Sequence, residues 1–100
     1  MQYGLKEDVV KDIQKIFKKY PEIKKVILYG SRAKGNYRFN SDIDLTLLGN
    51  ELDLATLFRI ETDLDDLLLP YKIDLSVFHK IENTALIDHI KRRGIPFYEG

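Results

Sequence analysis

Two segments of the chain carry the residues Ile-Asp-Leu within a run of alternating apolar and polar residues, one at 42–48 and the other at 72–78. A period of two is typical of a β-strand that buries one face, and it puts the acidic residues on the face opposite the isoleucines and leucines. A third β-rich run, residues 23–30, has four apolar or aromatic residues directly before Gly30, as in a central strand covered on both faces. The chain is thereby constrained to build a small sheet around three strands.

Apolar residues at helical spacing separate these strands. They predict helices over about residues 5–19 and 53–69, a short helix from Ser31, and a last helix that begins after Asn83 or Thr84 and stops at Gly94. The order α-β-α-β-α-β-α predicts an α/β (α+β) fold, a small twisted and mixed three-stranded sheet flanked by helices. Residues 95–98 are expected to pack on it as an apolar tail. A length of 100 residues predicts one domain over 1–100.

Composition excludes several classes of function. Sixteen basic residues balance sixteen acidic ones, so no net charge draws the chain to nucleic acid or to a membrane surface. The lack of cysteine excludes disulfides, thiolate metal sites and a cysteine nucleophile. No apolar run approaches the ~20 residues that span a bilayer, and the N-terminus does not look like a signal peptide. We therefore expect a cytoplasmic protein with no membrane partner and no direct nucleic-acid partner.

Three aspartates lie on the polar faces of the two alternating strands. Asp42 and Asp44 share a face because they are two residues apart, and Asp74 has the same phase in its own strand. An isolated Asp-x-Asp is more often a solvated strand edge that blocks aggregation. Three such residues in strands, where aspartate is disfavoured, instead favour a Mg²⁺ site, because clustered carboxylates repel one another unless a cation lies between them. Such a set suits two metal ions that act on a phosphoryl group.

Gly30 and Ser31 stand where the first strand meets the short helix. Backbone N–H groups at a helix start have no partner inside the helix and favour an anion, so this junction is a candidate phosphate cradle. Glycine-serine pairs are also common turn chemistry, and the motif is not a P-loop because Gly35 is followed by Asn36.

Together these motifs resemble those of the minimal nucleotidyltransferases, within the DNA polymerase β-like nucleotidyltransferase superfamily. The resemblance rests on Gly30-Ser31, ten intervening residues and Asp42-x-Asp44, and on Asp74 between apolar residues of a later strand. It covers about residues 5–98.

The resemblance implies a nucleotidyltransferase that transfers a nucleoside monophosphate to a hydroxyl acceptor. The expected group is AMP from ATP, and another nucleoside triphosphate remains an alternative substrate. It implies that Asp42 and Asp44 bind the metals that hold the triphosphate, and that Asp74 binds the second metal and activates the hydroxyl. The cofactor would be Mg²⁺, as two ions, with Mn²⁺ as a substitute. Gly30 and Ser31 would hold the β- and γ-phosphates. Arg32 and Lys34 are candidate phosphate neighbours, with a solvated basic helix face as the alternative.

Members of this size resemble the antitoxin half of two-gene modules whose partner is an all-helical HEPN-type toxin. The resemblance implies transfer of AMP to a tyrosine of that toxin. Two alternatives remain open: a small-molecule nucleotidyltransferase whose helical half is a separate subunit, and a non-catalytic binding partner that inhibits the toxin by contact. The sequence also leaves open whether the chain forms a homo-oligomer.

Overall fold

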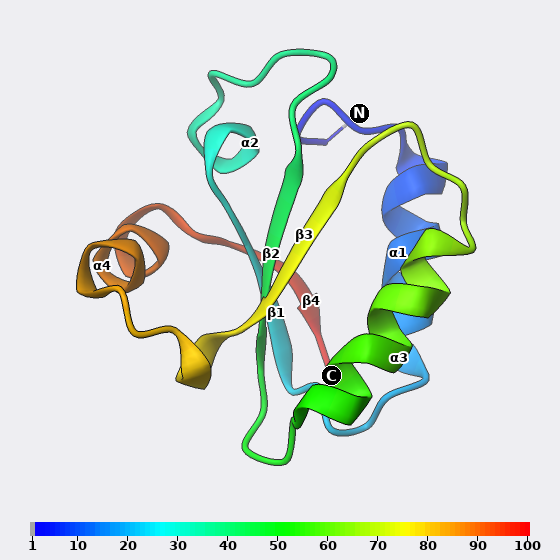
Figure 1. Cartoon of the computed structure of the whole chain (residues 1–100). Helices are drawn as coiled ribbons and strands as arrows, with labels where there is room; N and C mark the ends of the chain where they lie inside the picture. The colour runs from blue at the N-terminus through cyan, green and yellow to red at the C-terminus, as the bar shows by residue number, and fades with distance from the viewer. Residues whose placement is uncertain (1) are drawn as a thin grey trace.

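The computed structural model describes residues 2–100 (Figure 1). Its elements follow one another as α1 (Glu7–Lys18), β1 (Lys25–Tyr29), α2 (Ser31–Lys34), β2 (Ile43–Leu48), α3 (Leu54–Asp65), β3 (Ile73–Val77), the 3₁₀ turn η1 (Phe78–Lys80), α4 (Thr84–Arg93) and β4 (Ile95–Glu99). The strands form one sheet in the order β3-β2-β1-β4.

The sheet is mixed, as predicted, but it has four strands and not three. β1 pairs antiparallel with β2 and with β4, while β2 pairs parallel with β3. The expected apolar tail is the edge strand β4, which buries Phe97. The sequence did not predict this strand because it contains Pro96. Proline cannot donate a hydrogen bond to a neighbouring strand and is tolerated only at an edge or a bulge. The ladder between β1 and β4 does shift register at this place.

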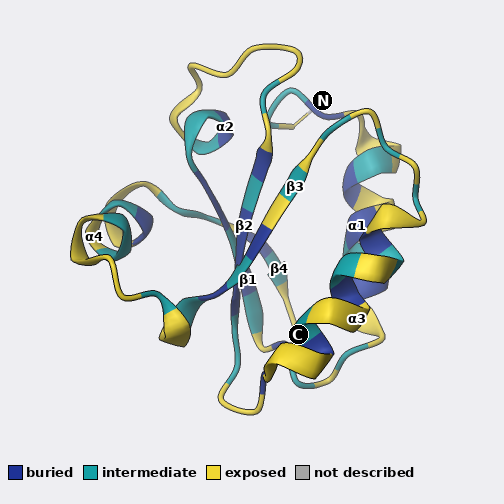
Figure 2. Ribbon diagram, viewed as in Figure 1, coloured by how far each residue is buried: buried dark blue, intermediate teal, exposed yellow. Residues whose placement is uncertain are grey.

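The apolar core lies between one face of the sheet and the pair α1 and α3. Alternate residues of β2 point into it, and Ile43, Leu45 and Leu47 are fully buried there. In Figure 2 the buried residues follow the strands and the inner faces of α1 and α3, and the outer faces of these helices are exposed. The predicted alternation of β2 is thereby confirmed. Its other face carries Asp44 toward the opposite side of the sheet.

Helix α3 ends at Asp65, earlier than the predicted position near residue 69. The apolar residues continue beyond the helix, but Leu68 takes a left-handed conformation with φ of 54° and is 88% exposed. The prediction of the helix end was therefore wrong. The spacing of apolar residues does not show where a helix ends when the turn that follows it is also made of apolar residues. At the other end, the side chain of Asp53 caps the helix by accepting a hydrogen bond from the N–H of Thr56 at 2.8 Å.

The second face of the sheet is only partly covered. Helices α2 and α4 lie on this side, opposite α1 and α3 (Figure 1). The polar face of β2 and β3 carries aspartates, and Asp74 on it is exposed. None of the helices over residues 2–100 is long and apolar enough to cross a membrane.

Candidate active site

Sheet register brings two of the three aspartates together. Asp44 of β2 and Asp74 of β3 are direct partners across the parallel ladder, and neighbouring strands lie about 4.8 Å apart. Asp42 precedes β2 and has the same phase as Asp44. Asp44 is half-buried, while Asp42 and Asp74 are exposed. The three aspartates therefore form an acidic patch that is held by β2 and β3 and is open to solvent.

The carboxylate of Asp44 is the electrostatic centre of this patch. Burial raises its pKa above the ordinary value of 3.8, and the negative charges of Asp74 and Asp42 raise it further. Arg32 and His89 act in the opposite direction but do not reverse the shift. The folded protein therefore holds Asp44 in its charged form at a cost in free energy, which a bound cation would remove.

The chemistry of these side chains fits Mg²⁺. All three supply the carboxylate oxygens that this ion prefers, and they share one face. Within residues 2–100, however, no group of three or more acidic or histidine side chains is arranged so that it could hold a metal ion by itself. Mg²⁺ commonly takes only one or two protein carboxylates and completes its shell with water and substrate phosphates. The patch is thus suited to an ion that arrives with a polyphosphate.

Gly30 lies directly against Asp44. Its backbone, with φ of 78° and ψ of −154°, is in a region that is essentially restricted to glycine. A Cβ atom at this position would come within 2.2 Å of Oδ2 of Asp44. The missing side chain therefore makes the space in which the carboxylate sits.

We predict that Gly30→Ala impairs both folding and transfer. The backbone strain is expected to cost about 1–3 kcal/mol of stability, and the new methyl group must displace the Asp44 carboxylate. Thermal melts and a transfer assay measure the two effects. Gly35→Ala is the matched control, since Gly35 also has a positive φ, of 86°, but a Cβ atom at this position would meet no atom within 4 Å. If both variants lose stability and only Gly30→Ala loses transfer, the contact with Asp44 is responsible; equal transfer in the two would contradict it.

The structure confirms the short helix that was predicted at Ser31, although its N-cap residue is Gly30 and not Ser31. It has only four residues, Ser31 to Lys34, and ends at Gly35 in a left-handed conformation. Because a macrodipole needs many aligned peptide units, one turn adds little positive potential for an anion. Lys34 at its end is exposed, so its ammonium group is accessible to a phosphate.

The sequence allowed Arg32 to be either a phosphate neighbour or part of a solvated basic helix face. The structure excludes the solvated face, because Arg32 is buried. It is only 2% exposed, and its guanidinium group donates to backbone carbonyl oxygens. Nη1 donates to Tyr3 at 2.8 Å, Nη2 and Nε both donate to Ser41 at 2.8 and 3.2 Å, and Nη2 donates to Phe39 at 3.3 Å. The rings of Tyr37 and Tyr71 also lie against it, 5.4 and 5.0 Å from the guanidinium carbon. With its donors so engaged, Arg32 organises the loop before Asp42 and is not offered to a phosphate.

Two residues of the site were not predicted from sequence. The N–H of Gly30 donates to Nε2 of His89 in α4 at 3.1 Å, and the imidazole packs edge-on against the ring of Tyr29. Tyr29 is the register partner of Asp44. The pKa of its hydroxyl is raised chiefly by burial, and the negative charges of Asp74 and Asp44 raise it further. A lone histidine on a helix gives no sequence signal for this contact, which depends on how α4 returns to the sheet.

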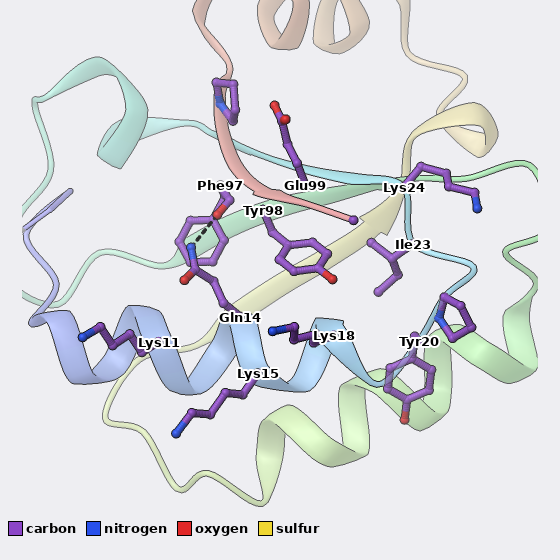
Figure 3. A pocket seen from close by; sticks show the side chains of 13 residues that line it. Lys11, Gln14, Lys15, Lys18, Tyr20, Ile23, Lys24, Phe97, Tyr98 and Glu99 are labelled. Atoms are coloured by element: carbon purple, nitrogen blue, oxygen red, sulfur yellow. Dashed lines mark hydrogen bonds between the residues drawn. The ribbon is translucent and has the colours of Figure 1, made fainter.

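A further hollow lies away from the acidic patch. It measures about 940 Å³ and lies between α1 and β4, with none of the aspartates in its lining. Figure 3 shows Lys11, Lys15 and Lys18 along α1, and Gln14 donating to the carbonyl oxygen of Phe97. Because no aspartate lines this hollow, we do not assign it to the chemistry of the acidic patch.

Comparison with known proteins identifies the family. The model of the family described as polymerase beta, nucleotidyltransferase matches residues 11–100. No curated protein matches the chain. Among solved structures, a toxin-antitoxin crystal structure with AMP-PNP aligns with a TM-score of 0.73 and 24% identity, over 91% of this chain and 73% of the matched chain.

Two further structures align in the same way. The toxin-antitoxin MntA-HepT has a TM-score of 0.69 and 21% identity, over 95% of this chain and 74% of the matched one. A tri-AMPylated Shewanella oneidensis HEPN toxin in complex with MNT antitoxin has a TM-score of 0.70 and 19% identity, over 96% and 74%. At these identities the structures show a shared fold, while the family match spans most of the chain. The chain belongs to the polymerase β nucleotidyltransferase family.

Proposed function

We propose that this chain transfers AMP from ATP to a hydroxyl group, with Asp42, Asp44 and Asp74 as metal ligands. The observation that carries the proposal is the pairing of Asp44 with Asp74 on adjacent strands, with Asp44 packed against Gly30. Two Mg²⁺ ions, or Mn²⁺ in their place, would supply positive charge to the triphosphate and to the reacting oxygens.

The residues have separate roles in this reaction. Asp42 and Asp44 would hold a metal ion that neutralises the charge of the triphosphate, and the Gly30-Ser31 turn and Lys34 would contact its β- and γ-phosphates. The acceptor oxygen forms a bond to the α-phosphorus, the bond from that phosphorus to the α,β-bridging oxygen breaks, and pyrophosphate leaves. Asp74 is exposed beside Asp44 and accepts the proton of the attacking hydroxyl. Most of the catalysis comes from positioning and charge neutralisation.

The acceptor that we propose is a tyrosine of a helical HEPN-type toxin, in the cytoplasm. Two observations support this choice. The aligned complexes pair an MNT antitoxin with a HEPN toxin, and in one of them the toxin is tri-AMPylated. In addition, Asp42 and Asp74 are exposed, so a second protein surface can reach the patch and exclude water from it.

Intact-mass spectrometry tests the acceptor. A candidate HEPN-type toxin is incubated with the chain, ATP and Mg²⁺. We expect a mass increase of one or more AMP units on a toxin tyrosine, and none when a chelator is present. A toxin that is inhibited by the chain but stays unmodified would contradict the proposal and favour inhibition by contact.

A further inference from the structure

The hollow between α1 and β4 is strongly basic (Figure 3). The lining holds one acid, Glu99, whose carboxylate lies 3.9 Å from Nζ of Lys25 outside the hollow. It also holds four exposed lysines, and none of them forms an ion pair with another residue in 2–100. These lysines are Lys11, Lys15, Lys18 and Lys24. In a chain whose net charge is zero, the hollow therefore presents four uncompensated positive charges.

Three of these lysines lie on one side of α1. Lys11, Lys15 and Lys18 follow one another at intervals of four and three positions, which places their side chains on the same helix face. At a rise of about 1.5 Å per residue, they span roughly 10 Å along the helix axis. Alternate residues of an extended strand share a face and lie about 6.6 Å apart. A strand with acids at two or three alternate positions therefore matches this row of lysines.

The other wall of the hollow is the free edge of the sheet. β4 is the last strand in the order β3-β2-β1-β4, and no strand within residues 2–100 pairs with its outer side. The N–H of Gly100 points inward and donates to the carbonyl oxygen of Lys24 at 2.9 Å. The carbonyl oxygen of Phe97 instead accepts from Nε2 of Gln14 in α1 at 2.8 Å, so it faces the hollow (Figure 3). Because backbone groups of a strand alternate between its two edges, those of Phe97 and Glu99 point outward.

We propose that the hollow binds an acidic, extended segment of a partner protein, which adds to β4 as a further strand and sets its carboxylates against the lysines of α1. In this kind of recognition, backbone pairing supplies affinity and alternate side chains supply specificity. A backbone N–H of the segment replaces Gln14 as the donor to Phe97. The free edge favours a peptide over a nucleic acid, which would use the lysines but not the backbone groups. The proposal goes beyond the proposed function, since none of the aspartates lines the hollow.

Fluorescence anisotropy with a labelled peptide of alternating glutamate and valine tests the charge match, without ATP or Mg²⁺. We expect wild type to bind this peptide and to bind it less tightly as the salt concentration rises. A variant without the three α1 lysines should bind it about tenfold more weakly, as for the loss of three exposed ion pairs. It carries the substitutions Lys11→Gln, Lys15→Gln and Lys18→Gln. No binding by wild type, or equal binding by this triple variant, would overturn the proposal.

Two controls make the charge effect specific to the hollow. The first is a variant that also loses three positive charges, at exposed lysines outside the lining. It carries Lys6→Gln, Lys72→Gln and Lys80→Gln, and it should bind the peptide as wild type does. The second is a peptide with glutamine in place of glutamate, which should bind wild type about tenfold more weakly. If the two lysine variants bind equally weakly, net charge and not the hollow is responsible, and the proposal fails.

Two N-methylated peptides test the backbone pairing. Each keeps every carboxylate but has methyl groups on one of the two alternating sets of backbone nitrogens. Only one set can face β4, so we expect one peptide to lose binding and the other to retain it. In amide NMR spectra, the unmodified peptide should shift the signals of Phe97, Glu99 and the side-chain amide of Gln14. Equal binding of the two methylated peptides would refute strand addition.

Sedimentation velocity and a single-stranded RNA of about ten nucleotides test the other occupants. We expect the triple variant to sediment as wild type does, and the RNA to bind wild type more weakly than the acidic peptide does. Self-association that the triple variant abolishes would assign the hollow to a second copy of the chain. Tighter binding of RNA that depends on the same lysines would assign it to nucleic acid. Either result would overturn the proposal, and neither depends on nucleotidyl transfer.

Discussion

Replacement of Asp44 by asparagine is expected to lower the rate of nucleotidyl transfer by at least about 1000-fold, or ~4 kcal/mol in the barrier. Asparagine has the size of aspartate but lacks the negative charge that holds a metal ion against the triphosphate. Asp44 is also the least exposed of the three carboxylates, because Asp74 pairs with it across the ladder and Gly30 lies against it. The toxin mass assay measures the loss. Glu51→Gln, at an exposed acid beyond the end of β2, is the control and should leave transfer unchanged.

The same variant distinguishes a functional carboxylate from a structural one. The raised pKa of Asp44 means that the folded state disfavours its charged form. The contribution of this group to stability is therefore least unfavourable below the ordinary pKa of 3.8, and the penalty develops as the pH rises through the raised value. Metal-free Asp44→Asn should consequently melt at or above the wild-type temperature at pH 7, and the difference should vanish near pH 3. Strong destabilisation at pH 7 would show instead that the carboxylate is a structural partner.

Loss of Arg32 is expected to produce the largest drop in stability. Arg32→Ala leaves the carbonyl oxygens of Tyr3, Phe39 and Ser41 without their donor in a partly buried setting, and each unsatisfied group costs up to about 1–3 kcal/mol. A total of ~3 kcal/mol would lower Tm by more than ~10 °C in a domain of this size. Because Ser41 precedes Asp42, transfer should also fall at temperatures where the variant is still folded.

Two controls make the assignment specific to the buried guanidinium. Arg38→Ala removes a positive charge from an exposed residue of the same loop and should change stability by less than about 0.5 kcal/mol. Arg32→Lys keeps the charge but cannot reproduce the fork of donors that reaches both Tyr3 near the N-terminus and the carbonyl oxygens of Phe39 and Ser41. It should therefore remain well below wild type in Tm. A lysine variant as stable as wild type would indicate that charge alone, and not the hydrogen-bond pattern, explains the burial of Arg32.

The sequence by itself determined which faces of β2 and β3 are polar. The alternation around Asp44 and Asp74 fixed their orientation, because a strand repeats every two residues whatever its neighbours are. The spacing of apolar residues similarly determined the presence of α1 and α3. The link between Gly30 and Asp42 is short and polar, which left a parallel crossover from β1 to β2 undecided. The two strands are antiparallel, and the sheet is mixed.

Only the tertiary structure decided which of these residues meet. The pairing of Asp44 with Asp74 depends on the order of strands in the sheet, which a local period does not encode. The contact between Gly30 and His89 joins residues 59 positions apart, and no pattern on α4 distinguishes this histidine from a surface residue. Arg32 lies in a basic, polar run of the sequence, yet it is buried because the loop folds its carbonyl oxygens over the guanidinium group. Local patterns thus assign residues to faces and elements, while the packing of elements from distant parts of the chain determines the site.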